Sequence, residues 1–474
     1  MQKNKRSTFA LVALTVALAL SGCSKQSVDF IEREPIEDTV EHVNEENAQL
    51  LSKYNTHKEN STLAFTTYGE NEASDFEYES VDGKISIKKY IGERDIVVIP
   101  SVIDGAPVTK IEERAFEGLA VRAVYIPDSV KNIGFAAFSE CTQMSTLRLP
   151  FVGDGLDIDF GGYIFGAEEY LENGLNVPGS LKMILLGDSV THISENAFYG
   201  FKSVEAFVLP DTIKKIDSFA FNDCRSLVYI NLPKGLQSIE QYAFLNCQSL
   251  YILEFPESLQ SIGIGALMDC SSLKYLTLSF VGGAKGENNF AGYIFGAERR
   301  EWNESFVPES LTHITLLGSC ESIAASAFED CKNIYSVDIL EGVTGVGISA
   351  FEGCEFLNRV SIADTVVSVS DKAFSGCRSL KEVNLSDSSR LEKISMQTFM
   401  GCKALTEIKL PASVKKIESS AFYGCTSLKK ISANGIESVE SSAFRNCNAI
   451  SEVSGINKSC VTEDGNSTLI AAIK

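Results

Sequence analysis

The residues most able to do chemistry in this chain are its cysteines, which recur at a regular interval. The chain has 13 cysteines, and ten of them lie three residues after a phenylalanine position, as in "AFYGC" at 421–425. A regular cysteine series could form disulfides, bind a metal, supply nucleophiles or fill a core. The ten cysteines are Cys141, Cys224, Cys247, Cys270, Cys331, Cys354, Cys377, Cys402, Cys425 and Cys447.

Packing is the role that the rest of the sequence favours for these cysteines. Leu119 and Phe201 take the cysteine position in two units, so the site requires an apolar side chain. Neighbouring strands lie about 4.8 Å apart, so distance alone leaves disulfides open. There is no C-x-x-C motif, and the four histidines lie away from the cysteines, which disfavours zinc and Cys-His catalysis. We therefore predict no catalytic residue, no metal and no cofactor, and we expect a protein that is not an enzyme.

The cysteines belong to a repeated unit of 22 or 23 residues, which is clearest in "ALTEIKLPASVKKIESSAFYGC" at 404–425. Its first part alternates, because Ile408 and Leu410 point one way while Glu407 and Lys409 point the other. This alternation predicts a short strand with one buried face, which the following proline ends. One unit cannot bury its own apolar side chains. Stacked units would form a parallel sheet over continuous internal columns.

These repeats resemble the leucine-rich repeats of the BspA-like family, the β-rich type also found in treponemal surface proteins. The resemblance extends from residue 75 to 455. It implies a β-rich leucine-rich-repeat solenoid, with one parallel strand per 22–23-residue repeat and short second strands and turns on the opposite side. We expect an N-terminal hairpin cap with its turn at Asp82-Gly83, and a closing hairpin around Asp464-Gly465.

Two units are longer than the rest. Both contain "GYIFGAE", at 162–168 and 292–298, and each adds about 15 residues to an otherwise normal repeat. Their separation of 130 residues indicates that a block of repeats was duplicated. We expect Phe165 and Phe295 to fill the phenylalanine position, and residues 167–179 and 297–309 to leave the solenoid as loops.

The N-terminus carries a targeting pattern. A basic segment precedes an apolar one, which predicts a signal peptide at 1–22. "LSGC" resembles the bacterial lipobox, which implies cleavage before Cys23 and a lipid on that residue; a plain secretory signal is the alternative. Residues 23–72 are predicted to be an acidic flexible stalk and residues 73–474 the solenoid with its cap and two inserts.

The formal net charge of −21 argues against binding of nucleic acid. Outward strand positions then become the candidate ligand-binding surface, and we expect an exposed apolar stripe along the first half of the solenoid. The alternative is that tyrosine and valine simply suit strands. The stripe consists of Tyr125, Val208, Tyr229, Ile252 and Tyr275.

The two inserts are a second candidate site. They carry Tyr170, Trp302 and Phe306, and Trp302 is the only tryptophan of the chain. Trp302 either contacts a ligand or holds its loop against the solenoid. Both interpretations remain open at this point.

The resemblance implies a lipid-anchored bacterial cell-surface protein that adheres to host or bacterial macromolecules, without catalytic activity. Its partner would be a protein or a glycan, its membrane contact the lipid on Cys23, and we expect a monomer. Two alternatives are an envelope scaffold without an extracellular ligand and a glycan-capture lipoprotein that uses the stripe around Tyr229 and Tyr275.

Overall fold

The structure is a computed structural model that describes residues 68–284 and 289–473. All of these residues belong to the second of the chain's two units, Lys53–Lys474. The predicted signal peptide, Cys23 and nearly all of the predicted stalk lie outside the described residues.

The described chain begins with the predicted hairpin cap, which follows a 3-10 turn, η1 (Ala73–Asp75). Strands β1 (Phe76–Val81) and β2 (Lys84–Tyr90) pair antiparallel across a turn at Asp82 and Gly83. Both turn residues have positive φ angles, 51° and 71°, as the tight hairpin turn requires. Strand β2 then pairs parallel with β5 (Ala106–Ile111), so the hairpin covers the first end of the solenoid.

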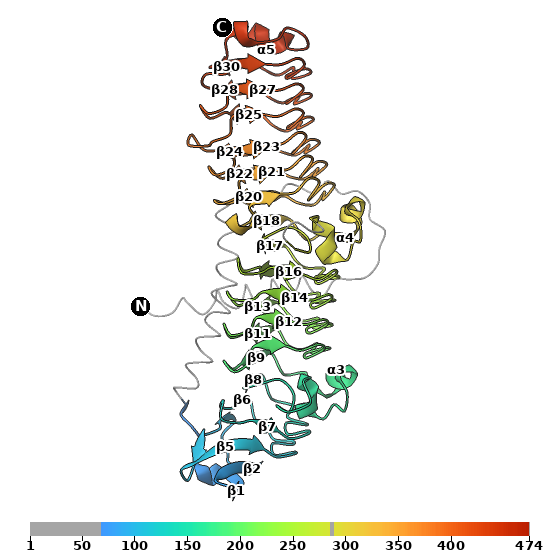
Figure 1. The fold of residues 1–474 in the computed structure, drawn as a ribbon. Helices are drawn as coiled ribbons and strands as arrows, with labels where there is room; N and C mark the ends of the chain where they lie inside the picture. Colours follow the sequence, from blue (N-terminus) through green and yellow to red (C-terminus); the bar gives the residue numbers. More distant parts are fainter. Residues whose placement is uncertain (1–67, 285–288, 474) are drawn as a thin grey trace, which may run out of the picture. The chain divides into compact units, whose positions relative to one another are not determined.

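The main strand of each repeat lies in one of three parallel sheets that follow one another along the solenoid (Figure 1). Within each sheet, every strand pairs parallel with the corresponding strand of the next repeat, so the predicted solenoid is confirmed. The strands are β3 (Ile96–Val98), β6 (Ala123–Tyr125), β8 (Thr146–Leu149), β9 (Met183–Leu186), β11 (Ala206–Val208) and β13 (Tyr229–Ile230); β15 (Ile252–Glu254), β17 (Tyr275–Leu278), β18 (His313–Leu316), β20 (Ser336–Ile339), β22 (Arg359–Ile362) and β24 (Glu382–Leu385); and β26 (Glu407–Lys409), β28 (Lys430–Ser432) and β30 (Glu452–Ser454).

The predicted second strands are also present, mostly two residues long and parallel to one another. They stack beside the main sheets and complete each turn of the solenoid. Besides β5 and its antiparallel partner β4 (Val102–Ile103), they are β7 (Asn132–Ile133), β10 (His192–Ile193), β12 (Lys215–Ile216), β14 (Ser238–Ile239), β16 (Ser261–Ile262), β19 (Ser322–Ile323), β21 (Gly345–Val346), β23 (Ser368–Val369), β25 (Lys393–Ile394), β27 (Lys416–Ile417) and β29 (Ser438–Val439).

Phenylalanine rings form a stacked column through the interior. Phe351 is fully buried, and its ring lies 5.0 Å from the ring of Phe328 and 5.3 Å from that of Phe374, nearly parallel to both. The backbone repeats with the rings, since the Phe351 N–H donates to the Ala373 carbonyl one repeat later. Each "Ala-Phe" pair is therefore both a packing element and part of the hydrogen-bond ladder.

The residue before each column cysteine has a conformational reason for its type. This position adopts a positive φ angle, for example 76° at Gly353 and 63° at Asn446. Glycine, asparagine and aspartate tolerate that conformation best, which explains why they dominate there in the sequence.

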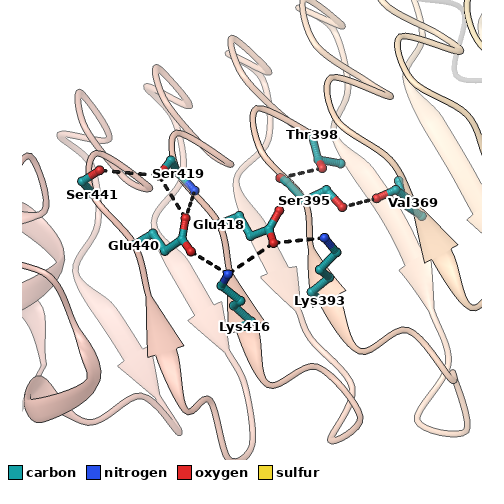
Figure 2. Close-up of polar contacts among 9 residues, drawn as sticks. All are labelled: Val369, Lys393, Ser395, Thr398, Lys416, Glu418, Ser419, Glu440 and Ser441. Atoms are coloured by element: carbon teal, nitrogen blue, oxygen red, sulfur yellow. Dashed lines mark hydrogen bonds and ion pairs between the residues drawn. The ribbon is translucent and has the colours of Figure 1, made fainter.

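A polar ladder crosses the short second strands near the C-terminal end (Figure 2). The Lys416 ammonium contacts the carboxylates of Glu440 at 2.6 Å and Glu418 at 3.4 Å, and Lys393 reaches the same Glu418 carboxylate at 3.0 Å. Ser419 joins it by donating to Glu440 at 3.0 Å. The stacked geometry thus pairs charges that lie one repeat apart in the sequence.

The two inserts begin as predicted but do not continue as irregular loops. Phe165 and Phe295 are buried at the phenylalanine position, each at the end of a 3-10 helix, η2 (Gly161–Phe165) or η4 (Ala291–Phe295). The segments predicted as loops at 167–179 and 297–309 instead form short helices, which project from the same side of the stack (Figure 1). These are η3 (Tyr170–Glu172) with α3 (Asn173–Asn176), and η5 (Arg300–Trp302) with α4 (Asn303–Phe306).

The expected closing hairpin around Asp464-Gly465 is wrong. A 3-10 turn, η7 (Lys458–Cys460), and a helix, α5 (Ser467–Ala472), end the chain instead. The Asn466 side chain accepts the Phe444 N–H at 2.9 Å and donates to the Glu440 carbonyl at 2.8 Å. Asn466 thus supplies to Phe444 the acceptor that the alanine carbonyl of the next repeat supplies at positions such as Phe422.

Candidate functional site

The outer strand face is the side of the main strands that points away from the interior. In its C-terminal part, beyond β20, the outward residues Glu382, Glu407, Lys409 and Lys430 are exposed. The Lys409 ammonium lies 2.7 Å from the Asp387 carboxylate, an exposed pair of little energetic value. This part of the face is polar and charged.

The N-terminal part of the outer strand face differs from its prediction. The stripe residues point away from the interior cluster, yet each is at most 9% exposed. Their outward neighbours are also apolar, since Val208 lies opposite Leu185 and Ile252 lies opposite Tyr275 on adjacent strands. Side chains at that spacing cover one another. The exposure predicted for Tyr125, Val208, Tyr229, Ile252 and Tyr275 is therefore wrong, while their role in ligand binding stays a prediction.

A histidine lies within this buried part of the outer strand face, on β18. The His313 ring centroid is 4.6 Å from that of Tyr275 and 6.1 Å from that of Tyr335, and the Lys274 ammonium lies 5.2 Å from the Tyr275 ring. Burial, together with the charge of Lys274, lowers the pKa of His313 to about 3. The imidazole is consequently neutral at physiological pH and acts as an aromatic packing residue.

The second insert presents the largest exposed aromatic ring of the described chain. Trp302 is 40% exposed, and its ring stacks on Phe306 with centroids 6.0 Å apart and planes at 17°. The Arg299 guanidinium lies over the same indole at 5.7 Å. A hollow of about 830 Å³ lies beside these groups, and Asn289, Phe290, Arg299, Arg300, Glu301, Trp302, Ala324 and Ala325 line it.

The first insert has the same backbone plan but a different surface. Tyr170 packs edge-on against Tyr199, with centroids 5.5 Å apart, and is only partly exposed. The Glu172 carboxylate, which takes the position of Trp302, accepts the Glu168 N–H at 2.9 Å. Tyr170 therefore supports the first insert, whereas Trp302 leaves much of its ring accessible.

Each insert contains a buried asparagine that was not predicted from the sequence. Asn303 makes hydrogen bonds to the backbone, whereas the side-chain amide of Asn173 has no hydrogen-bond partner among the described residues. The Asn303 side chain accepts the Gly292 N–H at 2.8 Å and donates to the Glu329 carbonyl at 3.2 Å. Asn173 is fully buried at the equivalent position beside Gly162. A side chain at either glycine would collide with the asparagine. The signal was available, because both residues recur at the 130-residue offset while most of their neighbours change.

The column cysteines occupy the interior, as predicted. The ten column cysteines are all buried, and none of them forms a disulfide. Their thiols donate to the backbone of the preceding repeat, for example from Cys354 to the Phe328 carbonyl at 3.2 Å. Burial raises the pKa of Cys141 to about 11 and that of Cys270 to about 12. Such thiols remain protonated and are poor nucleophiles.

Within residues 68–284 and 289–473, no cluster of three or more His, Cys, Asp or Glu side chains could hold a metal ion. No helix within the same part of the chain has both the length and the apolar character needed to cross a membrane.

Comparison with known proteins places the repeat pattern in a family. The profile of the BspA-type leucine-rich repeat region matches residues 99–156, 176–292, 302–390 and 387–467, which is more than half of the chain. No curated protein matches the chain.

Several solved structures are similar. A leucine-rich repeat protein from Bacteroides ovatus is 25% identical, with 80% of this chain and 92% of that chain covered, at a TM-score of 0.35. A leucine-rich cell surface protein from Faecalibacterium prausnitzii is 22% identical, with 81% and 94% covered, at 0.30. The pneumococcal vaccine antigen PcpA is 14% identical, with 83% and 96% covered, at 0.29.

Proposed function

The chain belongs to the BspA-type leucine-rich-repeat family, and from this premise we propose that it is a lipid-anchored bacterial cell-surface protein that binds a macromolecule through its solenoid. The proposed role is binding and adhesion without catalysis.

The observation that carries this proposal is the contrast between interior and outer positions of adjacent strands. Within one ladder the interior residues Ile408, Ile431 and Val453 are near-identical in type. The outward residues beside them change from Glu407 to Lys430. A solenoid built on constant columns can vary its outer strand face without loss of stability, which suits recognition of a specific partner.

A protein is the partner class that we favour. Repeat solenoids offer extended, rigid binding surfaces, and charged outward rows such as those of Glu407, Lys409 and Lys430 suit the polar rim of a protein interface. Glycan capture remains a second candidate, supported by the exposed indole of Trp302. An envelope scaffold without an extracellular ligand is the third.

Binding assays against two arrays separate these candidates. The full chain, labelled with a fluorophore, is applied to an array of host and bacterial surface proteins and to a glycan array. Saturable binding to proteins supports the proposal, and saturable binding to glycans alone would replace it with glycan capture. Binding to neither array would leave the scaffold role.

Membrane attachment is proposed through a lipid on Cys23, which lies outside the described residues. Replacement Cys23→Ser should move the protein from the membrane fraction to the soluble or secreted fraction, because a thiol is required for the lipid. Retention of the variant in the membrane fraction would contradict this attachment.

A further inference from the structure

We propose that the second insert is a docking site for an acidic segment of a protein partner, with Arg299 and Arg300 binding carboxylates and Trp302 packing against an adjacent apolar side chain. This inference rests on the proposed function and specifies the chemistry of the partner. It concerns the hollow beside Trp302, which is separate from the outer strand face.

The cationic side chains beside the hollow are those of Arg299 and Arg300. Arg299 lies over the Trp302 indole, so its guanidinium is held in place by the ring rather than by an acid. The ion pairs among the described residues do not include Arg299. Among the described residues, Arg300 forms an ion pair with Glu301 at 3.7 Å, and both side chains are more than half exposed, so this pair is weak. Two arginines and one carboxylate, that of Glu301, thus line the hollow, which gives it a net positive charge although the chain as a whole carries a charge of −21.

The tryptophan is supported by Phe306 and Asn303. Phe306 stacks on Trp302, and a Cβ at Gly296 would lie 3.6 Å from the Phe306 ring, so the ring covers this glycine turn. Asn303 fixes the helix that carries Phe306 to the backbone of the next repeat. The exposed indole is therefore a rigid feature, and rigid aromatic and arginine side chains are the residues that dominate binding energy at protein interfaces.

The first insert carries different residues at these positions. Glu169, Tyr170, Glu172 and Asn176 take the places of Arg299, Arg300, Trp302 and Phe306, while the buried asparagine and its glycine are kept. The first insert nevertheless forms the same succession of short helices. Since the insert folds without tryptophan or arginine, these residues are not required to hold the loop. Arg299 reverses the charge of Glu169, Arg300 replaces the neutral Tyr170, and Trp302 removes the charge of Glu172. These differences suit an anionic ligand.

A protein segment fits these groups better than an acidic glycan does. Arginine binds a carboxylate through two parallel hydrogen bonds, and a peptide can place a carboxylate beside an apolar side chain within one or two residues. Arg299 and Phe306 both lie against the Trp302 ring, so part of the ring is already covered. The accessible part of the ring suits an aliphatic side chain packing alongside more than a sugar stacking face to face.

The only tryptophan of the chain provides the readout, because intrinsic tryptophan emission then reports this site alone. The full chain is titrated at physiological salt with a ten-residue peptide of alternating Glu and Leu, and separately with the matching Gln and Leu peptide. We expect a saturable change in Trp302 emission with the Glu peptide and at least tenfold weaker binding of the Gln peptide. Equal responses to the two peptides, or no saturable response, would overturn the proposal.

Two variants, each of which replaces an arginine by a glutamate, test whether the peptide binds at the second insert. Arg299→Glu, which places the residue of the first insert at this position, should lower the affinity for the Glu peptide at least tenfold. Arg378→Glu, on a different repeat, should change that affinity less than twofold. Circular dichroism and melting temperature establish that both variants are folded. Equal weakening by both variants would overturn the site, because it would indicate only the overall charge of the protein.

An oligogalacturonate of four to six sugars forms the third arm of this experiment. An Arg299-dependent response to this sugar without one to the Glu peptide would replace the protein segment with an acidic glycan and overturn the inference. Failure here is distinguishable from failure of the proposed function. An array partner that binds the Arg299→Glu variant as tightly as the unmodified chain would leave the proposed function standing and exclude this site.

Discussion

The rings of Phe351 and Phe374 lie in consecutive repeats with centroids 5.3 Å apart and planes only 3° from parallel. Residues 23 positions apart in sequence thus become direct neighbours, and the relationship recurs along the column. The stability of the solenoid therefore comes from contacts between repeats, because each repeat is stabilised by the repeats on either side of it.

Phe351→Ala should destabilise the solenoid by about 3–5 kcal/mol, because it leaves a cavity between two stacked rings. Phe356→Ala is the matched control in the same repeat, since the Phe356 side chain is 56% exposed. Urea unfolding followed by circular dichroism measures both variants. A similar loss of stability from the two substitutions would contradict the column.

The column thiols should be unreactive toward a disulfide reagent in the folded protein, with the exception of Cys447, whose pKa is lowered by its hydrogen bond with Cys425. They are buried, and burial raises the pKa of thiols such as Cys141. Cys460, which is partly exposed, should react first. Mass spectrometry of the labelled protein identifies the modified residue. Rapid labelling of column cysteines other than Cys447, or disulfides found among them after denaturation without reductant, would contradict this account.

Asn303→Ala should destabilise the second insert by about 1–3 kcal/mol, because it leaves the Gly292 N–H and the Glu329 carbonyl without their partner. The emission of Trp302 should shift to the red as the insert loosens. Asn173→Ala, the equivalent change in the first insert, should leave that emission unchanged. A red shift in both variants, or in neither, would show that the asparagine does not hold its own insert.

His313 should make stability depend on pH between about 3 and 6.5. Its pKa in the folded protein is lowered to about 3, whereas the ordinary value is 6.5. The unfolded chain therefore binds a proton in this window that the folded protein does not, and stability rises with pH across it. At pH 4.5, His313 should lower the free energy of unfolding by about 2–3 kcal/mol relative to its contribution at pH 7.

His313→Phe should remove this contribution. The free energy of unfolding in urea is measured at pH 4.5 and pH 7 for both proteins. The contribution of His313 is the difference between the two pH dependences, since the carboxylates titrate in both proteins. The same pH dependence in the two proteins would exclude a buried neutral imidazole.

The sequence predicted the interior of the solenoid better than its surfaces. Repeated Phe and Cys positions specify columns because every copy places the same side chain in the same environment. Accessibility at Tyr229 and Tyr275 was mispredicted because it depends on contacts from outside the strand, which alternation within one strand does not contain. The insert helices and the Asn466 cap escaped prediction because their buried polar contacts involve single residues outside the repeat.

The site in the second insert was only partly predicted. The sequence singled out Trp302 and Phe306 as aromatic residues, but the position of Arg299 over the indole follows from the 3-10 helix that brings them together. The role of the buried Asn303 side chain could be recognised only from its hydrogen bonds in the structure.

Protease treatment of intact cells tests the central claim of surface display most directly. The account predicts that a non-permeant protease releases peptides from residues 68–473 into the medium while a cytoplasmic marker protein stays intact. Failure to release these peptides from intact cells, with release only after lysis, would contradict a cell-surface binding protein.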